Sequence, residues 1–99
     1  MKKPLKIKNF SIGERSKTFV IAEIGINHDG NFEKCKRLIK AASNCGADAA
    51  KIQLVNVRES YDKKTNSFKE FKDKNFSDDQ LRDLKKYAKQ NKMLTSCTP

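Results

Sequence analysis

Tryptophan is absent from this sequence of 99 residues, and proline and glycine are scarce, at two and four residues. No run of about 18 apolar residues is present, so the sequence predicts no membrane-spanning helix. The N-terminal segment 1–6 is not followed by the apolar stretch that a secretion signal needs. We therefore expect a cytoplasmic protein that does not bind a membrane.

Cysteine is present, but without the spacing of a metal or redox site. Cys35, Cys45 and Cys97 form no C-x-x-C motif and no Cys/His ligand pattern. Cys35 and Cys45 fall on the apolar face of a predicted helix, where a thiol packs as a small hydrophobic residue. The sequence therefore predicts no metal site within these residues.

Acidic residues are outnumbered by basic ones, 12 against 22, which gives a net charge of +10. Such a balance is compatible with a small basic module that binds nucleic acid. However, the lysines are scattered along the chain and form no arginine-rich stripe interleaved with aromatic residues. We favour a solvated lysine-rich surface, and no nucleic-acid partner.

The hydrophobic pattern of the first half predicts a hairpin, a strand and a helix. Alternating apolar residues over 5–12, broken at residues 13–16, favour a short β-hairpin that leads into a strand at residues 18–24. Apolar residues then recur at helical spacing over residues 32–45.

Local signals define the ends of this helix. Asp29 or Asn31 can cap its N-terminus, and Gly46 is a typical helix stop. A strand at residues 49–55 follows the stop closely, so the spacing predicts a right-handed parallel β-α-β crossover.

The second half begins with a long polar segment, residues 56–76, which we expect to fold back over the domain. The residues Ser77 to Gln80 form a capping box, and a helix to about residue 90 and a strand at 93–98 follow. The aromatic residues of the segment are Tyr61, Phe68, Phe71 and Phe76, and Phe76 can act as a hydrophobic staple.

Polar residues near the end of each predicted strand fall on one face. Side chains alternate along a strand, so Lys51 and Gln53 share a face, as do Ser96 and Thr98, while Glu23 is the charged residue of the first strand. In a parallel sheet the carboxyl ends of the strands carry the site. We expect these side chains to converge, because a charge in a buried strand is costly unless it is paired or used. The alternative is a purely structural buried ion pair between Glu23 and Lys51.

The loop after the first strand contains Asn27 and His28. A single loop histidine more often fixes loop hydrogen bonds than carries chemistry, so we interpret both residues as loop support.

Three segments, 21–30, 46–53 and 96–99, resemble the sialic acid synthase family in order and spacing. This family includes the N-acetylneuraminate, legionaminate and pseudaminate synthases. The resemblance implies a (β/α)8 barrel that condenses phosphoenolpyruvate with an N-acylated hexose. It also implies a divalent metal, Mn or Mg, and a homodimer for the complete protein.

The resemblance also implies roles for single residues. Lys51 is similar to the lysine that holds the phosphate of phosphoenolpyruvate, and Thr98 to a hydroxyl beside it. Glu23 resembles the glutamate at the reacting centre, and Gln53 resembles a hydrogen-bond donor to the substrate. Two departures are Leu54, where many members have a small hydroxyl residue, and Cys97, where serine is common.

The expected fold class is therefore α/β, a partial TIM barrel of three strands and two helices preceded by a short hairpin. Residues 1–99 would form the N-terminal part of the catalytic domain, and the metal ligands would lie on later strands. We expect this chain to be poorly stable and inactive by itself. A different phosphate-binding barrel or aldolase, with Lys51 as a Schiff-base nucleophile, is the alternative enzyme.

Overall fold

The computed structural model describes residues 3–54, 62, 64–66 and 75–98. Strands β1 (Leu5–Ile7) and β2 (Phe10–Ile12) pair antiparallel, which confirms the predicted hairpin. The expected break at residues 13–16 is not the hairpin turn, because the strands are joined at Lys8, whose φ is 52°. A non-glycine residue with positive φ leaves little signal in a sequence. Residues 13–16 instead form a second turn, closed by a bond from Ser16 N to Gly13 O of 3.1 Å.

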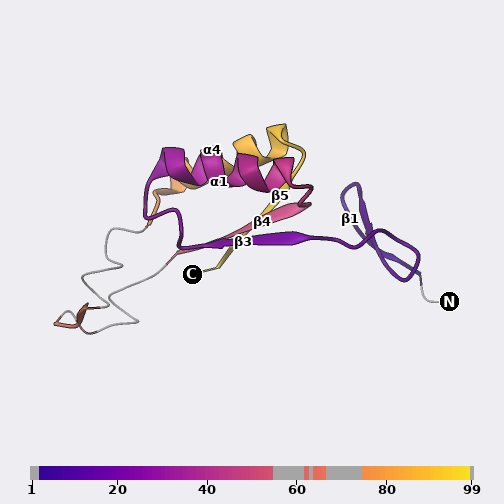
Figure 1. Ribbon diagram of the computed structural model, residues 1–99, viewed down its shortest axis with the longest axis horizontal. Coiled ribbons are helices and arrows are strands. Elements are labelled where there is room, and N and C mark those ends of the chain that lie inside the picture. Colours follow the sequence, from indigo (N-terminus) through magenta and orange to yellow (C-terminus); the bar gives the residue numbers. More distant parts are fainter. Residues whose placement is uncertain (1–2, 55–61, 63, 67–74, 99) are drawn as a thin grey trace.

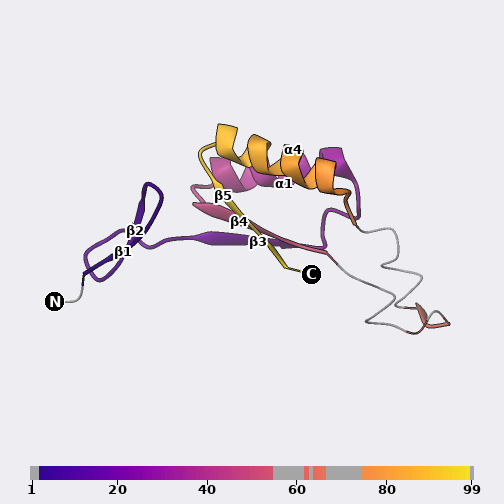
Figure 2. The same ribbon diagram turned by 180° about the vertical axis from the view of Figure 1, so that it is seen from behind.

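A three-stranded sheet forms the body of the molecule. Strands β3 (Ile21–Gly25), β4 (Ala49–Gln53) and β5 (Leu94–Thr98) pair in that order, and both pairings are parallel. Helices α1 (Phe32–Asn44) and α4 (Asp78–Gln90) lie side by side over one face of this sheet (Figures 1 and 2). The hairpin lies beyond the N-terminal end of β3, away from the helices (Figure 1). The predicted β-α-β order is therefore confirmed for the described residues.

Helix α1 is capped by Asn31 rather than by Asp29. The Asn31 Oδ1 atom accepts a hydrogen bond from Lys34 N at 2.9 Å. Asp29 instead has a φ of 55° within the preceding loop, and its carboxylate pairs with the Lys34 ammonium. At the other end Gly46 has a φ of 88°, a conformation that suits glycine after a helix, so the predicted stop is confirmed.

The capping box predicted for the second helix is present at the start of α4. The Ser77 hydroxyl accepts from Gln80 N at 3.1 Å, and the Gln80 side chain accepts from Ser77 N at 3.0 Å. Two backbone donors that a helix N-terminus would otherwise leave unpaired are thereby satisfied.

The hydrophobic core lies between the two helices and the sheet. Ile39 of α1 and Leu84 of α4 are fully buried there against Ala50 and Ile52 of β4. Lys36 adds a contact between the helices, because its ammonium lies 4.8 Å from the centroid of the Tyr87 ring. The face of the sheet opposite the helices takes no part in this core.

The two cysteines expected in the core have different surroundings. Cys35 is fully buried, as predicted, and burial raises the pKa of its thiol to about 11. Cys45 is exposed, so the prediction was wrong for this residue. The reason is that α1 ends at Asn44, and Cys45 lies at its C-cap, beyond the part of the helix that packs on the sheet.

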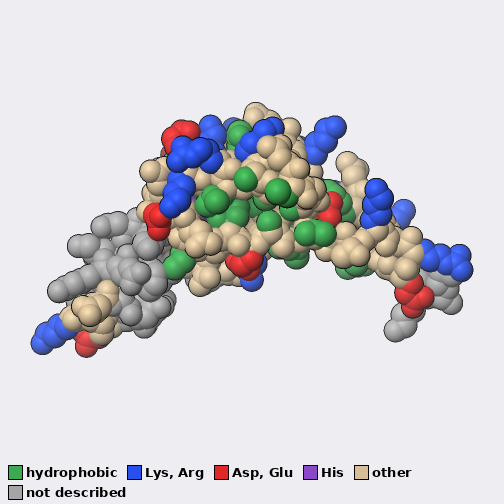
Figure 3. Space-filling view, in the orientation of Figure 1, with side chains coloured by type: hydrophobic (Ala, Val, Ile, Leu, Met, Phe, Trp, Pro, Cys, Tyr) green, Lys and Arg blue, Asp and Glu red, His purple; other side chains and the backbone are tan. Residues whose placement is uncertain are grey.

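Most of the polar segment 56–76 lies outside the described residues, including Tyr61, Phe68 and Phe71. Phe76 is described and buried. Within the described ranges no helix is long and apolar enough to cross a membrane. On the face shown in Figure 3, Lys and Arg side chains lie over the helices and the hairpin, while hydrophobic side chains gather between α1 and β3.

Candidate functional site

The sheet face opposite the helices carries side chains in rows that cross the strands. Parallel register partners share a face, so the pairing itself defines each row. The row nearest the N-terminal ends of the strands is apolar and is followed by a charged row and then by a polar row. The members of these rows are Ile21, Ala49 and Leu94; then Glu23, Lys51 and Ser96; then Gln53 and Thr98.

The structure brings Glu23 and Lys51 together in the middle of this face. They are register partners on β3 and β4, and the Lys51 Nζ atom lies 3.5 Å from Glu23 Oε2. A gap of 3.5 Å is a loose ion pair rather than a tight hydrogen bond. The ammonium therefore keeps donor capacity for a further group.

The pair is not buried in this chain. The side chains of Lys51 and Glu23 are 38% and 56% exposed. The expectation of charges in a buried strand was therefore wrong, because both helices pack on the other face and the described residues leave this one open to solvent (Figure 1).

Strand β3 becomes irregular just beyond Glu23. The register between β3 and β4 shifts between Glu23 and Gly25, and Gly25 has a φ of 58°. A residue with a Cβ atom would be strained in that conformation. The strand thus ends at Gly25, two residues after the carboxylate, and Asn27 follows in the loop with an exposed side chain.

His28 is fully buried beneath this loop. Its Nδ1 atom accepts a hydrogen bond from Gly30 N at 3.0 Å. Its Nε2 atom lies 3.0 Å from Gln53 O, which can only accept, so Nε2 is the donor of this hydrogen bond. The ring also packs against Phe76, with 4.6 Å between the centroids. His28 thereby links the β3–α1 loop to the end of β4 and to the start of α4.

Gln53 and Thr98 are register partners at the carboxyl ends of β4 and β5. Leu54 N donates to Thr98 O at 2.8 Å, which holds the two strand ends together. The exposed Ser96 precedes Thr98 by two residues and lies beside Lys51 in the charged row. This spacing of two residues is the sequence signal that places Ser96 on the same face as Thr98.

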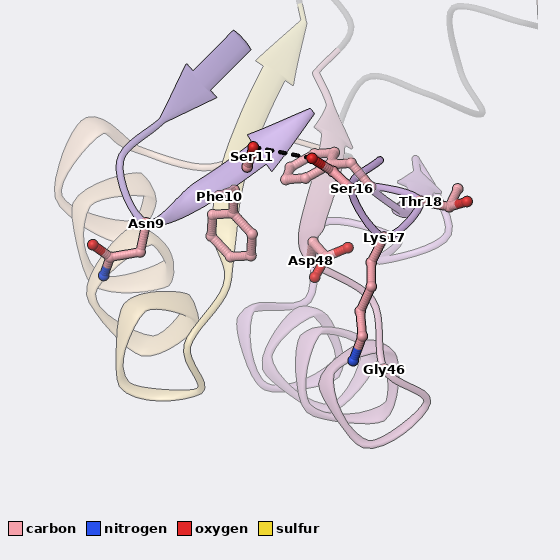
Figure 4. A pocket seen from close by; sticks show the side chains of 9 residues that line it. Asn9, Phe10, Ser11, Ser16, Lys17, Thr18, Gly46 and Asp48 are labelled. Atoms are coloured by element: carbon pink, nitrogen blue, oxygen red, sulfur yellow. Dashed lines mark hydrogen bonds between the residues drawn. The ribbon is translucent and has the colours of Figure 1, made fainter. Parts of the chain in front are cut away.

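A hollow of about 450 Å³ lies at the opposite, N-terminal end of the strands. Residues of the hairpin, of the segment before β3 and of the turn after α1 line it, among them Phe10, Lys17 and Asp48 (Figure 4). The Asp48 carboxylate is engaged, because it accepts from Val20 N at 2.9 Å. This hollow contains none of the predicted site residues.

Metal-binding side chains do not gather in the described part of the chain. No group of three His, Cys, Asp or Glu residues there is arranged to hold an ion. His28 does not fit as a ligand either, because the backbone already occupies both of its ring nitrogens. These residues therefore do not fit a divalent metal.

Comparisons with known proteins agree on one family. The NeuB family model matches residues 38–99. An uncharacterized protein of Methanocaldococcus jannaschii is 36% identical over 96% of this chain and 28% of its own length. The human N-acetylneuraminate-9-phosphate synthase is 35% identical, covering 80% of this chain and 26% of the human protein.

A solved structure has the same fold. The sialic acid synthetase of Leptospira borgpetersenii, in complex with citrate, superimposes with a TM-score of 0.88 at 28% identity, over 98% of this chain and 34% of the synthetase. The chain thus spans between about a quarter and a third of the length of these relatives.

Proposed function

Because the chain belongs to the NeuB family, we propose that it supplies the first strands of a (β/α)8 barrel that makes a nonulosonic acid. The complete barrel condenses phosphoenolpyruvate with an N-acylated hexose and releases phosphate. Consecutive parallel strands with both helices on one face support this architecture. The side chains of the open face lie on the side of the sheet away from the helices, which is the side that faces the interior of such a barrel.

The observation that carries the proposal is the pairing of Glu23 with Lys51 on the open face. Lys51 binds the phosphate of phosphoenolpyruvate, because an ammonium with free donors is a strong partner for a multiply charged oxyanion. Thr98 adds a hydroxyl from β5, and Gln53 donates to the substrate. Asn27 and His28 support the loop that borders these groups.

Glu23 lies where a proton acceptor or donor is needed. In the reaction the methylene carbon of phosphoenolpyruvate bonds to the aldehyde carbon of the sugar, whose oxygen takes up one of the two protons that the attacking water releases and becomes a hydroxyl. Water adds to the neighbouring carbon, and the bond from that carbon to the phosphate oxygen then breaks. A carboxylate beside the reacting carbons can accept the proton of that water. No step is assigned to a metal, because the described residues do not fit one.

Titration of the purified chain with phosphoenolpyruvate, followed by calorimetry, tests the proposal. We expect saturable binding that Lys51→Ala abolishes. Lys86→Ala is the matched control, because it removes an exposed lysine from α4 on the opposite side of the sheet and leaves the same net charge as Lys51→Ala. Equal binding by both variants would refute a specific role for Lys51.

Chemical trapping separates this function from an aldolase. A Schiff-base lysine forms a stable adduct when borohydride reduces its imine with a carbonyl substrate. We expect no adduct at Lys51 after treatment with pyruvate and borohydride, as measured by mass spectrometry. A stoichiometric adduct at this residue would favour the aldolase instead.

A further inference from the structure

Ser96 occupies a position on the open face that the proposed reaction has not yet used. Its Cα atom is the register partner of Lys51, just as Glu23 is the partner of Lys51 on the other side. Neighbouring strands lie about 4.8 Å apart, so the three side chains form one row with the ammonium at its centre. Ser96 is exposed, and its hydroxyl makes no hydrogen bond with the described residues.

The charges of this row determine which side of Lys51 an anion can occupy. The Glu23 carboxylate lies 3.5 Å from the ammonium on the β3 side, and it repels a phosphate there. On the β5 side the neighbours are neutral hydroxyls, from Ser96 in the same row and from Thr98 in the next. A phosphate that binds Lys51 is therefore favoured over β5.

A hydroxyl at this position is well suited to a phosphate. It donates a hydrogen bond to an oxyanion without adding charge, and such charge-assisted bonds are stronger than those between neutral groups. The alternation of β5 places Thr95 and Cys97 on the face toward the helices, although all three residues of this stretch, Ser96 included, border a groove beside α4. Ser96 is thus the residue of β5 that faces the Lys51 ammonium directly.

We propose that Ser96 is a substrate-binding residue that donates a hydrogen bond to the phosphate held by Lys51, over β5. This inference rests on the proposed function, since it assumes that Lys51 binds the phosphate of phosphoenolpyruvate. It also orients phosphoenolpyruvate across the sheet, with its phosphate over β5 and its reacting carbons toward Glu23.

Calorimetric titration of the purified chain with phosphoenolpyruvate, inorganic phosphate and pyruvate tests the inference. Ser96→Ala should weaken the binding of both phosphate compounds on the order of tenfold, the value of one hydrogen bond to a charged group, and leave any pyruvate binding unchanged. Ser96→Thr keeps the hydroxyl and should bind like the parent chain. Thr95→Val is the matched control, because it removes a hydroxyl from the opposite face of the same strand at nearly constant volume.

The outcomes separate the two proposals. If the parent chain binds no phosphoenolpyruvate, or if Lys51→Ala binds as well as the parent, the proposed function fails and the role of Ser96 fails with it. If Lys51→Ala loses binding while Ser96→Ala retains it fully, only the role of Ser96 is overturned. An equal loss in Ser96→Ala and Thr95→Val, or a loss confined to pyruvate, also overturns it. Circular dichroism of each variant shows whether a loss reflects unfolding, and Ser96→Thr then decides whether the hydroxyl matters.

Discussion

Replacement of His28 by phenylalanine isolates what the two ring nitrogens of this buried side chain contribute to the free energy of unfolding. His28 is fully buried, and both of its ring nitrogens bond to backbone groups. Phenylalanine preserves an aromatic ring of similar size and its packing against Phe76, so the change leaves no large cavity. What it removes is one hydrogen bond to Gly30 N and one to Gln53 O.

The size of the effect follows from these two bonds. Each is part-buried, and the net contribution of such a bond is about 1 kcal/mol. In the variant the Gly30 N–H and the Gln53 carbonyl have only partial access to water, so hydrogen bonds to water do not fully replace the two that are lost. We therefore expect His28→Phe to lower the free energy of unfolding by about 2 kcal/mol. Asn27→Ala, at an exposed site in the same loop, should change it by less than about 0.5 kcal/mol.

Urea unfolding followed by circular dichroism measures both variants against the parent chain. Nitrogen chemical shifts of the parent imidazole give an independent reading, because they distinguish a protonated Nε2 from a protonated Nδ1. A His28→Phe variant as stable as the parent would refute the reasoning. So would a shift pattern that shows the proton on Nδ1, since that atom must accept from Gly30 N.

Further outcomes follow from the helix cap and the cysteines. Ser77→Ala should lower the free energy of unfolding by about 1 kcal/mol, because it removes the acceptor for Gln80 N; an unchanged urea midpoint would contradict the role of the capping box. Burial raises the pKa of Cys35 from 9.0 to about 11, so as the pH rises this thiol ionises first in the unfolded chain. The free energy of unfolding therefore falls by up to about 2 to 3 kcal/mol as pH rises from 9 to 11. Cys35→Ala should reduce the change in the free energy of unfolding between pH 9 and pH 11. The same change in the variant and in the parent chain would count against this prediction. Iodoacetamide at pH 8 should modify the exposed Cys45 before Cys35, as peptide mass mapping can establish, and the reverse order would contradict the burial of Cys35.

Local signals in the sequence were sufficient to predict the elements. Helical spacing and a glycine stop predicted α1, and the pattern Ser77 to Gln80 predicted the start of α4, because capping and periodicity involve neighbouring residues. The hairpin turn at Lys8 was missed, since a single positive φ in a non-glycine residue is decided by the pairing of the strands. The burial of Cys45 was wrongly predicted, because helical spacing does not show where a helix stops touching its sheet.

The candidate site, too, was predicted from the sequence only where its features depend on residues close along the chain. The alternation of side chains within each strand was enough to predict that Lys51 shares a face with Gln53, and Ser96 with Thr98, because a strand repeats every two residues. The sequence could not show which residues of different strands are neighbours, since register depends on pairing across the sheet. That Glu23 and Ser96 flank Lys51, and that its ammonium lies 3.5 Å from Glu23, became evident only in the structure.

The sequence by itself thus determined the order of the elements, their caps and the polar residues near the strand ends, because each depends on contacts between residues close along the chain. Only the tertiary structure decided that both helices cover one face of the sheet, that the charged face is open, and that His28 is enclosed by Gly30, Gln53 and Phe76. These features depend on packing between segments distant in the sequence, whose positions are set by the path of the whole chain rather than by any local pattern.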